Sequence, residues 1–247
     1  MPPKVKSIFV IKSQTNTRAM LIDTNSMTSN DQSRSRQRIT DHGEVFTSSR
    51  EVDAMLDLVK QETERIDSRF LEPACGHGNF LAAILERKLD VVEQQYKKSQ
   101  LEFERYSVIA VGSIYGIDLL PDNVKQARER LLEIFTERYS ALYKSMAKNE
   151  CIASIRFILG KNIVVGDALE MTIAKDSDIP IVFSEWSLVN GSSIKRRDFA
   201  FEHLTPGIPM DSLFRDTGEQ GFIPKPIREF PIVHYLKISD DDSSSYN

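Results

Sequence analysis

The segment at residues 70–81, Phe-Leu-Glu-Pro-Ala-Cys-Gly-His-Gly-Asn-Phe-Leu, constrains the fold more than any other part of the chain. An apolar pair, two closely spaced glycines and a second apolar run predict a buried strand end, a tight turn and a helix start. Glycine adopts backbone angles closed to other residues, so a ligand can approach the main chain at Gly76 and Gly78. The helix start adds unpaired N–H groups, so the segment predicts a cofactor-binding turn.

Glu72, just before this turn, indicates the kind of cofactor. A carboxylate repels a phosphate but pairs with an ammonium group, and the turn lacks the third glycine of the dinucleotide fingerprint. Both observations favour a cofactor with a charged amino-acid end over a dinucleotide. The Gly-x-Gly spacing alone leaves an alternative, in which the turn is a tight connection without a ligand.

The string that begins at Glu72 resembles the S-adenosylmethionine (AdoMet) turn of adenine-N6 DNA methyltransferases, including the modification subunits of restriction-modification systems. The resemblance spans about residues 38–186. It implies an α/β protein with the Rossmann-like fold of AdoMet-dependent methyltransferases, in which helices flank a mostly parallel sheet. It also implies AdoMet as the cofactor, with Glu72, Gly76 and Gly78 among the cofactor-binding residues.

The segment Gly43-Glu-Val-Phe-Thr47 is similar to the family segment that closes over the methionine end of AdoMet. The resemblance implies cofactor contacts for Phe46 and Thr47. Ser48 stands where the family often has proline, which leaves helix capping as a competing role for Thr47. Packing against the following helix is the alternative for Phe46.

Two further acids follow predicted strands, at Asp118 and Asp167. Ligands of parallel sheets bind at the carboxyl ends of the strands, so an acid after the second strand can accept hydrogen bonds from a ribose diol. Asp118 has this position, and Asp167 resembles the residue that accepts from the adenine amino group of AdoMet. A helix cap is the alternative for Asp118, and a strand-end turn is the alternative for Asp167.

Strand and helix patterns alternate along the middle of the chain, which favours a parallel sheet covered by helices. Helices are expected at about residues 52–59, 79–89, 89–106 and 124–148, and strands at 70–71, at 107–111 or 114–117, at 163–165 and at 181–183. Pro121 suits the first turn of the helix that follows it.

Composition divides the chain into three parts. Residues 1–37 are polar and basic without a sustained period, which predicts a flexible N-terminal arm. Residues 38–206 form the expected methyltransferase-like domain. Residues 207–247 form an irregular C-terminal extension, because its prolines and glycines break helices and strands. This extension ends in an acidic, polar tail at residues 240–245 that is expected to be disordered.

The expected last strand runs into Ser184-Glu185-Trp186-Ser187, where the family carries Asn/Asp-Pro-Pro-Tyr/Phe. In the family, this tetrad accepts hydrogen bonds from the target amino group and stacks on the flipped base. The resemblance therefore implies candidate catalytic roles for Ser184 and Glu185 as acceptors and for Trp186 as the stacking ring. No Asn-Pro-Pro occurs in the chain, and a strand end with Trp186 packed in the core is the alternative.

The three adjacent cations Lys195, Arg196 and Arg197 are candidates for binding nucleic-acid phosphates. A solvated face or a site for an acidic partner explains them equally well, and the net charge of −4 gives no overall attraction to nucleic acid. Two cysteines and four dispersed histidines indicate neither a disulfide framework nor a metal site. No apolar run reaches the ~18 residues of a membrane span, and a cytoplasmic location is expected.

The resemblance implies an AdoMet-dependent DNA methyltransferase-like protein that acts on adenine N6 within a restriction-modification system. The alternatives are a noncatalytic AdoMet-binding or assembly subunit, and a methyltransferase that acts on RNA, protein or a small molecule. The transfer is expected to be a direct displacement, which needs alignment rather than a catalytic cysteine. Only 80 residues follow Asp167, so a partner, a specificity or nuclease subunit, is expected to recognise the DNA sequence.

Overall fold

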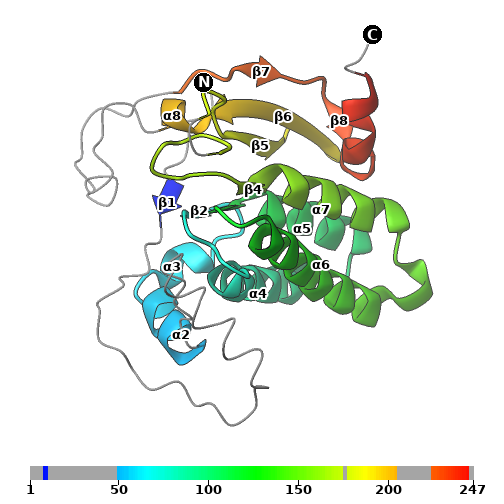
Figure 1. The fold of residues 1–247 in the computed structure, drawn as a ribbon. Helices are drawn as coiled ribbons and strands as arrows, with labels where there is room; N and C mark the ends of the chain where they lie inside the picture. Colours follow the sequence, from blue (N-terminus) through cyan, green and yellow to red (C-terminus); the bar gives the residue numbers. More distant parts are fainter. Residues whose placement is uncertain (1–7, 11–48, 175–176, 205–223, 245–247) are drawn as a thin grey trace.

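The computed structural model describes residues 8–10, 49–174, 177–204 and 224–244. A parallel sheet of four strands, in the order β1-β2-β3-β4, lies beside a bundle of helices (Figure 1). The strands are β1 (Ile8–Val10), β2 (Arg69–Glu72), β3 (Ile114–Asp118) and β4 (Ile163–Val165). The chain is therefore an α/β protein, as the alternating pattern predicts.

Strand β1 comes from the N-terminal segment that was expected to be a flexible arm. Phe9 pairs with Phe70, and Phe70 in turn pairs with Ile114, so β1 forms the edge of the sheet beside the strand that leads into the glycine turn. The remainder of the arm, together with Phe46 and Thr47, lies outside the described residues.

Helices connect the parallel strands. After the short helices α2 (Ser49–Asp57) and α3 (Lys60–Thr63), each crossover contains two long helices: α4 (Asn79–Tyr96) and α5 (Gln100–Gly112), then α6 (Pro121–Tyr143) and α7 (Asn149–Asn162). Of the two alternatives for the second core strand, residues 107–111 belong to α5, and 114–117 form β3. Ser99 caps α5 by accepting a hydrogen bond from the N–H of Glu102 at 3.4 Å.

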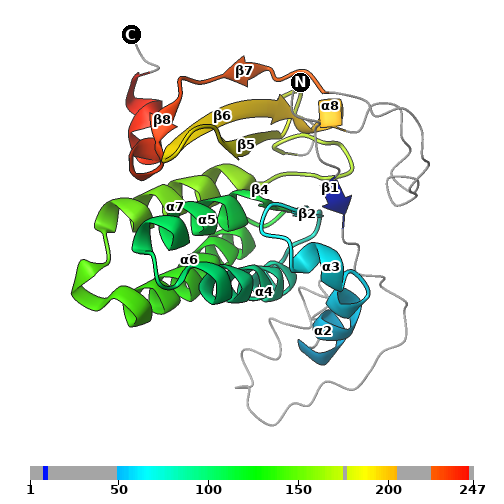
Figure 2. The same cartoon turned by 180° about the vertical axis from the view of Figure 1, so that it is seen from behind.

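The prediction of a fourth parallel strand at residues 181–183 is wrong. The chain there enters an antiparallel sheet of β5 (Val182–Leu188), β6 (Ser193–Ala200), β7 (Arg228–Glu229) and β8 (Val233–His234). A turn with Gly191 at φ +54° links β5 directly to β6, and such a short link permits antiparallel pairing only. Figures 1 and 2 both show this sheet beside α5 and α7, with α4 on the far side of the bundle.

The core has two parts. The larger part joins the four long helices to the antiparallel sheet, and the smaller part lies between the two sheets. In the smaller part, Phe183 of β5 meets Tyr115 of β3 edge to face, with ring centroids 5.3 Å apart. It also meets Phe201 of the short helix α8 (Phe201–Leu204) at 5.6 Å. The two sheets are therefore fixed to each other through aromatic packing.

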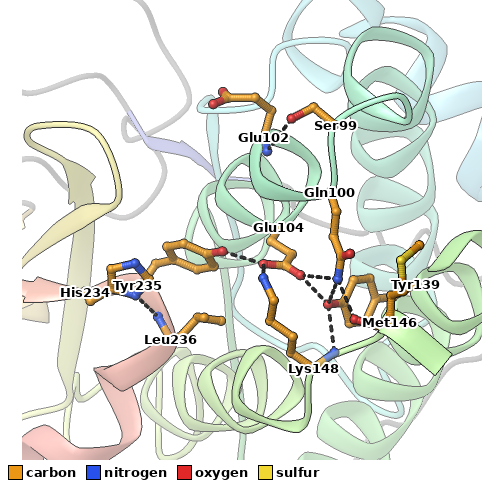
Figure 3. Close-up of polar contacts among 10 residues, drawn as sticks. All are labelled: Ser99, Gln100, Glu102, Glu104, Tyr139, Met146, Lys148, His234, Tyr235 and Leu236. Carbon is orange, nitrogen blue, oxygen red and sulfur yellow. Dashed lines mark hydrogen bonds and ion pairs between the residues drawn. The ribbon is translucent and has the colours of Figure 1, made fainter. Parts of the chain in front are cut away.

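The C-terminal segment forms the 3-10 helix η2 (Tyr235–Ser244), which extends into the acidic stretch whose composition predicts disorder. Tyr235 donates a hydrogen bond to Glu104 on α5, whose carboxylate is fully buried (Figure 3). Glu104 also accepts from Tyr139, from Gln100 at 2.7 Å and from Lys148 at 2.8 Å. This network anchors the end of the chain to the helices.

None of the described helices is long and apolar enough to span a membrane.

Candidate functional site

The glycine turn between β2 and α4 has the left-handed backbone conformation that its two glycines predict. Gly76 and Gly78 have φ angles of +49° and +80°, a region that side-chain-bearing residues rarely adopt. A Cβ atom at Gly78 would lie 3.0 Å from the Cβ of Ala127 on α6, whereas one at Gly76 would meet no atom within 4 Å. Gly78 thus allows α4 and α6 to pack closely, and Gly76 leaves open space above the turn.

Asp118, at the end of β3, holds this turn from the neighbouring strand. Its Oδ2 accepts a hydrogen bond from the N–H of Gly76 at 2.8 Å. Its Oδ1 accepts from the N–H of Leu120 at 2.9 Å and from the side chain of Asn123 at 3.0 Å. The half-buried carboxylate therefore shapes the turn and the start of α6 together, and Oδ2, which accepts one bond where Oδ1 accepts two, retains acceptor capacity for a ligand.

Glu72 ends β2 directly below the turn and is 3% exposed. Its Oε1 accepts a long bond from the N–H of Ala74 at 3.4 Å, and its Oε2 has no hydrogen-bond partner among the described residues. Burial raises the pKa of this carboxyl to about 8, and the bond from Ala74 offsets only part of that rise. A buried acceptor without a partner is costly, and a ligand cation would relieve that cost.

Cys75 fills the space beside the turn and is buried. Burial raises the pKa of its thiol, and the charges of Asp118 and Glu72 raise it further. A Cβ atom at Gly116 would lie 3.1 Å from its Sγ, so the side chain packs tightly on β3. A thiol that resists ionisation is not a nucleophile.

Asp167 follows β4 and folds the chain back on itself. Its Oδ1 accepts from the N–H groups of Leu169 at 2.8 Å and Glu170 at 3.2 Å, an arrangement typical of a turn-forming aspartate. A Cβ atom at the preceding Gly166 would lie 2.6 Å from Ile181, so the chain itself occupies that space. Both observations fit the strand-end turn, and both of these bonds end on Oδ1 rather than on Oδ2 of the half-buried Asp167.

Two exposed leucines beside these acids were missed by sequence reasoning. Leu119 follows Asp118 and is 55% exposed, and Leu169 lies two positions after Asp167 and is 77% exposed. Apolar side chains at this edge of the sheet can cover a flat ring and exclude water from it. Sequence could identify them only through their adjacency to the strand-end acids.

The candidate catalytic residues lie inside β5 and are buried. Ser184 donates a hydrogen bond to Asp198 at 2.7 Å, and Glu185 pairs with Arg69. Trp186 is 6% exposed and meets Phe157 edge to face, with ring centroids 6.1 Å apart. These contacts favour the alternative in which Trp186 is part of the core.

The structure does not bring these residues to the glycine turn. Arg69, the partner of Glu185, begins β2, whereas Glu72 ends it. Three steps along a strand span roughly 10 Å, while reacting atoms must approach to about 3–3.5 Å. Glu185 therefore lies at the opposite end of β2 from the turn.

Each of the three candidate nucleic-acid-binding cations has a carboxylate partner. Lys195 pairs with Glu229 and the buried Arg196 pairs with Asp198, both at 2.9 Å. Arg197 pairs with Glu185 at 2.6 Å. These residues therefore do not form a surface of unpaired cations that could bind a phosphate backbone.

Comparisons with protein-family models, with curated proteins and with solved structures find no match. The described residues also contain no group of three or more histidine, cysteine, aspartate or glutamate side chains that could hold a metal ion. The candidate site therefore rests on its own geometry: a glycine turn, a buried carboxylate below it and two acids at neighbouring strand ends.

Proposed function

We propose that this chain binds AdoMet at the turn between β2 and α4 and acts as a methyltransferase-like subunit in DNA modification. The observation that carries the proposal is the buried Glu72 carboxylate, whose Oε2 has no hydrogen-bond partner among the described residues and lies beneath an open glycine turn. The ammonium group of the methionine moiety supplies the charge that this oxygen needs.

The other groups at this edge suit the rest of the cofactor. Oδ2 of Asp118 keeps acceptor capacity for a ribose hydroxyl, and the free space at Gly76 admits the ligand to the main chain. The exposed side chains of Leu119 and Leu169 pack against the adenine ring. Oδ2 of Asp167 accepts a hydrogen bond from the adenine amino group. Together these groups offer contacts for the ammonium group, the ribose and the adenine of AdoMet.

The buried tetrad position favours a noncatalytic or assembly role for the isolated chain over independent methylation. Ser184 and Trp186 are used within the protein, and no described group at the glycine turn replaces an Asn-Pro-Pro-Tyr tetrad. A partner that supplies the base-binding groups and recognises the DNA sequence completes the system. Within that assembly, the target is adenine N6, which attacks the sulfonium methyl group directly.

Isothermal titration calorimetry with AdoMet tests cofactor binding on the folded wild type. At pH 7, binding of the ammonium group ionises Glu72, so titrations in buffers of different ionisation enthalpy should reveal release of up to one proton. Glu72→Gln should lose both affinity and proton release. Glu86→Gln, an exposed substitution on the helix after the turn, should change neither.

A methylation assay with duplex DNA separates the alternatives. Binding of AdoMet without transfer identifies the assembly subunit, and transfer by the chain alone identifies a complete enzyme. A folded chain that does not bind AdoMet overturns the proposal.

A further inference from the structure

A cavity of about 850 Å³ lies at the amino end of the parallel sheet. It is open to solvent on one side and lined by the segment that leads into β2, by α4 and α5, by the β5–β6 hairpin and by Glu229 of β7. Arg69 at the start of β2 lines it, whereas Glu72 at the end of β2 belongs to the glycine turn. The cavity and the proposed AdoMet site are therefore at opposite ends of one strand.

Two arginines share one glutamate in the wall of this cavity. Arg69 donates a hydrogen bond to Oε1 of Glu185, and Nη2 of Arg197 lies 2.6 Å from Oε2 of the same carboxylate. The three side chains are at most 23% exposed. One carboxylate neutralises one guanidinium, so this Arg-Glu-Arg triad by itself has a net charge of +1, which Glu229, opposite Arg197 in the β6–β7 pair, offsets in part.

The other charges around the cavity are balanced locally. Lys195 pairs with Glu229 at 2.9 Å, and Arg65 pairs with Glu62 at 3.3 Å and with Asp67 at 3.7 Å. Glu64 pairs with Lys60 at 3.6 Å. The lining as a whole contains four cations and four carboxylates, so any positive excess is local to the triad, where two guanidiniums meet one carboxylate. Partial burial strengthens the attraction of these two guanidiniums for an anion.

The rest of the lining is largely apolar. Its apolar members are the aliphatic side chains Ile66, Val91, Ile109, Leu188 and Val189 and the rings of Tyr106 and Trp186, beside Gly112 and the polar residues Gln95, Ser113 and Ser187. A cavity of this size with one charged pole and an apolar wall suits a ligand with an anionic head and a flat or apolar body.

We propose that this cavity binds a nucleotide, with Arg69 and Arg197 holding its phosphate and the apolar wall covering its base. Each guanidinium has five N–H donors in a planar fork that matches phosphate oxygens, and the triad uses few of them. The base contributes a flat face that packs on aliphatic and aromatic side chains. A free nucleotide and the phosphorylated end of a nucleic-acid strand share this chemistry.

Trp186 gives the experiment a direct reporter, because it lines the cavity and the chain has one tryptophan. Titration with uridine monophosphate should produce a saturable change in its fluorescence. Uridine, which lacks the phosphate, and inorganic phosphate, which lacks the base, should each bind at least tenfold more weakly. Uracil also avoids confusion with the adenine part of the AdoMet site.

Arg69→Gln and Arg197→Gln should each weaken binding of uridine monophosphate at least tenfold. Arg138→Gln is the matched control, since Arg138 pairs with Asp90 on the outside of the helices. Asp118→Ala should lower AdoMet affinity and leave the binding of uridine monophosphate unchanged. This variant therefore distinguishes a failure of the nucleotide proposal from a failure of the proposed AdoMet function.

Val189 provides a pair of variants that preserve the triad, because it lines the cavity and is 43% exposed. Val189→Glu should weaken nucleotide binding and Val189→Lys should strengthen it. The inference is overturned if uridine monophosphate does not bind, if it binds no better than uridine, or if these two variants shift affinity in the same direction.

An oligonucleotide with a 5′-phosphate identifies the source. Competition with uridine monophosphate by this strand, but not by its 5′-hydroxyl counterpart, identifies a nucleic-acid end as the ligand. A lack of competition, with the mononucleotide still bound, identifies a free nucleotide.

Discussion

The N–H of Gly76 lies 2.8 Å from Oδ2 of Asp118, and this bond joins the glycine turn to the end of the next strand of the sheet. The two residues are 42 positions apart in the sequence. Through this bond, the carboxylate fixes the main-chain conformation on which the open space at Gly76 depends.

Asp118→Ala should weaken AdoMet binding by about 1–3 kcal/mol, because it removes an acceptor for the ribose hydroxyls and releases the turn. Calorimetry measures the change in affinity. Asp90→Ala, which removes a surface carboxylate on α4, should leave the affinity unchanged. Equal affinities of wild type and Asp118→Ala would contradict this role.

Glu72 should make the stability of the free protein fall as pH rises. Its pKa is 4.5 when unfolded and about 8 when folded, so between these values the folded state holds a proton that the unfolded state has lost. The contribution of Glu72 to the free energy of unfolding is full below pH 4.5 and is lost as pH rises through 8.

Urea unfolding at several pH values checks this expectation. As the pH rises from 4.5 to 8, wild type should lose stability relative to Glu72→Gln, which has no carboxyl group to ionise at this position. The difference between their free energies of unfolding should change by an amount on the order of a few kcal/mol. The exposed variant Glu86→Gln should follow wild type. A difference that does not change with pH would rule out a shifted Glu72.

Tyr235→Phe should loosen the C-terminal segment, because the buried Glu104 carboxylate loses one of its donors. Hydrogen bonds to charged groups contribute about 1.5–3 kcal/mol, and the free energy of unfolding should fall by this amount. Hydrogen exchange should accelerate in residues 233–240. Tyr96→Phe, outside this network, is the control, and equal exchange in both variants would argue against the anchor.

Glu104 itself should show the opposite pH dependence from Glu72. Burial raises the pKa of its carboxyl, but the hydrogen bonds from Lys148, Tyr139, Tyr235 and Gln100 outweigh this effect and lower it overall. Its stabilising contribution is thus present above the ordinary pKa near 4.5 and is lost as pH falls through the lower, folded value.

Trp186→Ala should destabilise the fold by about 3–5 kcal/mol, the usual cost of truncating a large core side chain. A Cβ atom at Gly112 would lie 3.0 Å from its ring, so the indole is closely surrounded. Denaturant unfolding measures the loss, with Trp186→Phe as the smaller change. A Trp186→Ala protein as stable as wild type would contradict the core role and make Trp186 a candidate for contact with the target base again.

The isolated chain should bind duplex DNA weakly and without sequence preference. Its net charge is −4 and the cations on β6 are paired, so few phosphate contacts are available. Fluorescence anisotropy against duplexes of different sequence measures the affinity, and addition of a specificity subunit should raise both affinity and discrimination. Tight, selective binding by the chain alone would contradict this expectation.

The glycine turn and the acid after β3 could be predicted because their determinants are local. Glycine at positive φ and an acid at a strand end depend on a few neighbouring residues. The alternation of apolar segments and turns likewise indicated an α/β protein. Whether the fold carries AdoMet stays a prediction.

The antiparallel hairpin could not be predicted in the same way. The apolar run at residues 181–183 suits a parallel or an antiparallel strand equally, and its pairing depends on residues 193–200. The boundary between α6 and α7 depends on Lys144, which adopts a positive φ of 49° despite its side chain. Sequence patterns therefore merge these helices or miss the second one.

The burial of Glu104 was also beyond sequence analysis. A glutamate between Phe103 and Arg105 in a polar helical stretch is typical of a solvated position. Its donors come from α5, from α6, from the start of α7 and from the C-terminal segment. Charge burial that depends on such distant partners is decided only when the tertiary structure forms.

The bond between Tyr235 and Glu104 also has a consequence for the order of events during synthesis. The two residues are 131 positions apart, and translation at about 5–20 residues per second separates their appearance by roughly 7–26 seconds. During this interval the emerging helices contain a carboxylate whose last donor does not yet exist. The nascent chain can complete its native packing only after the segment around Tyr235 has left the ribosome.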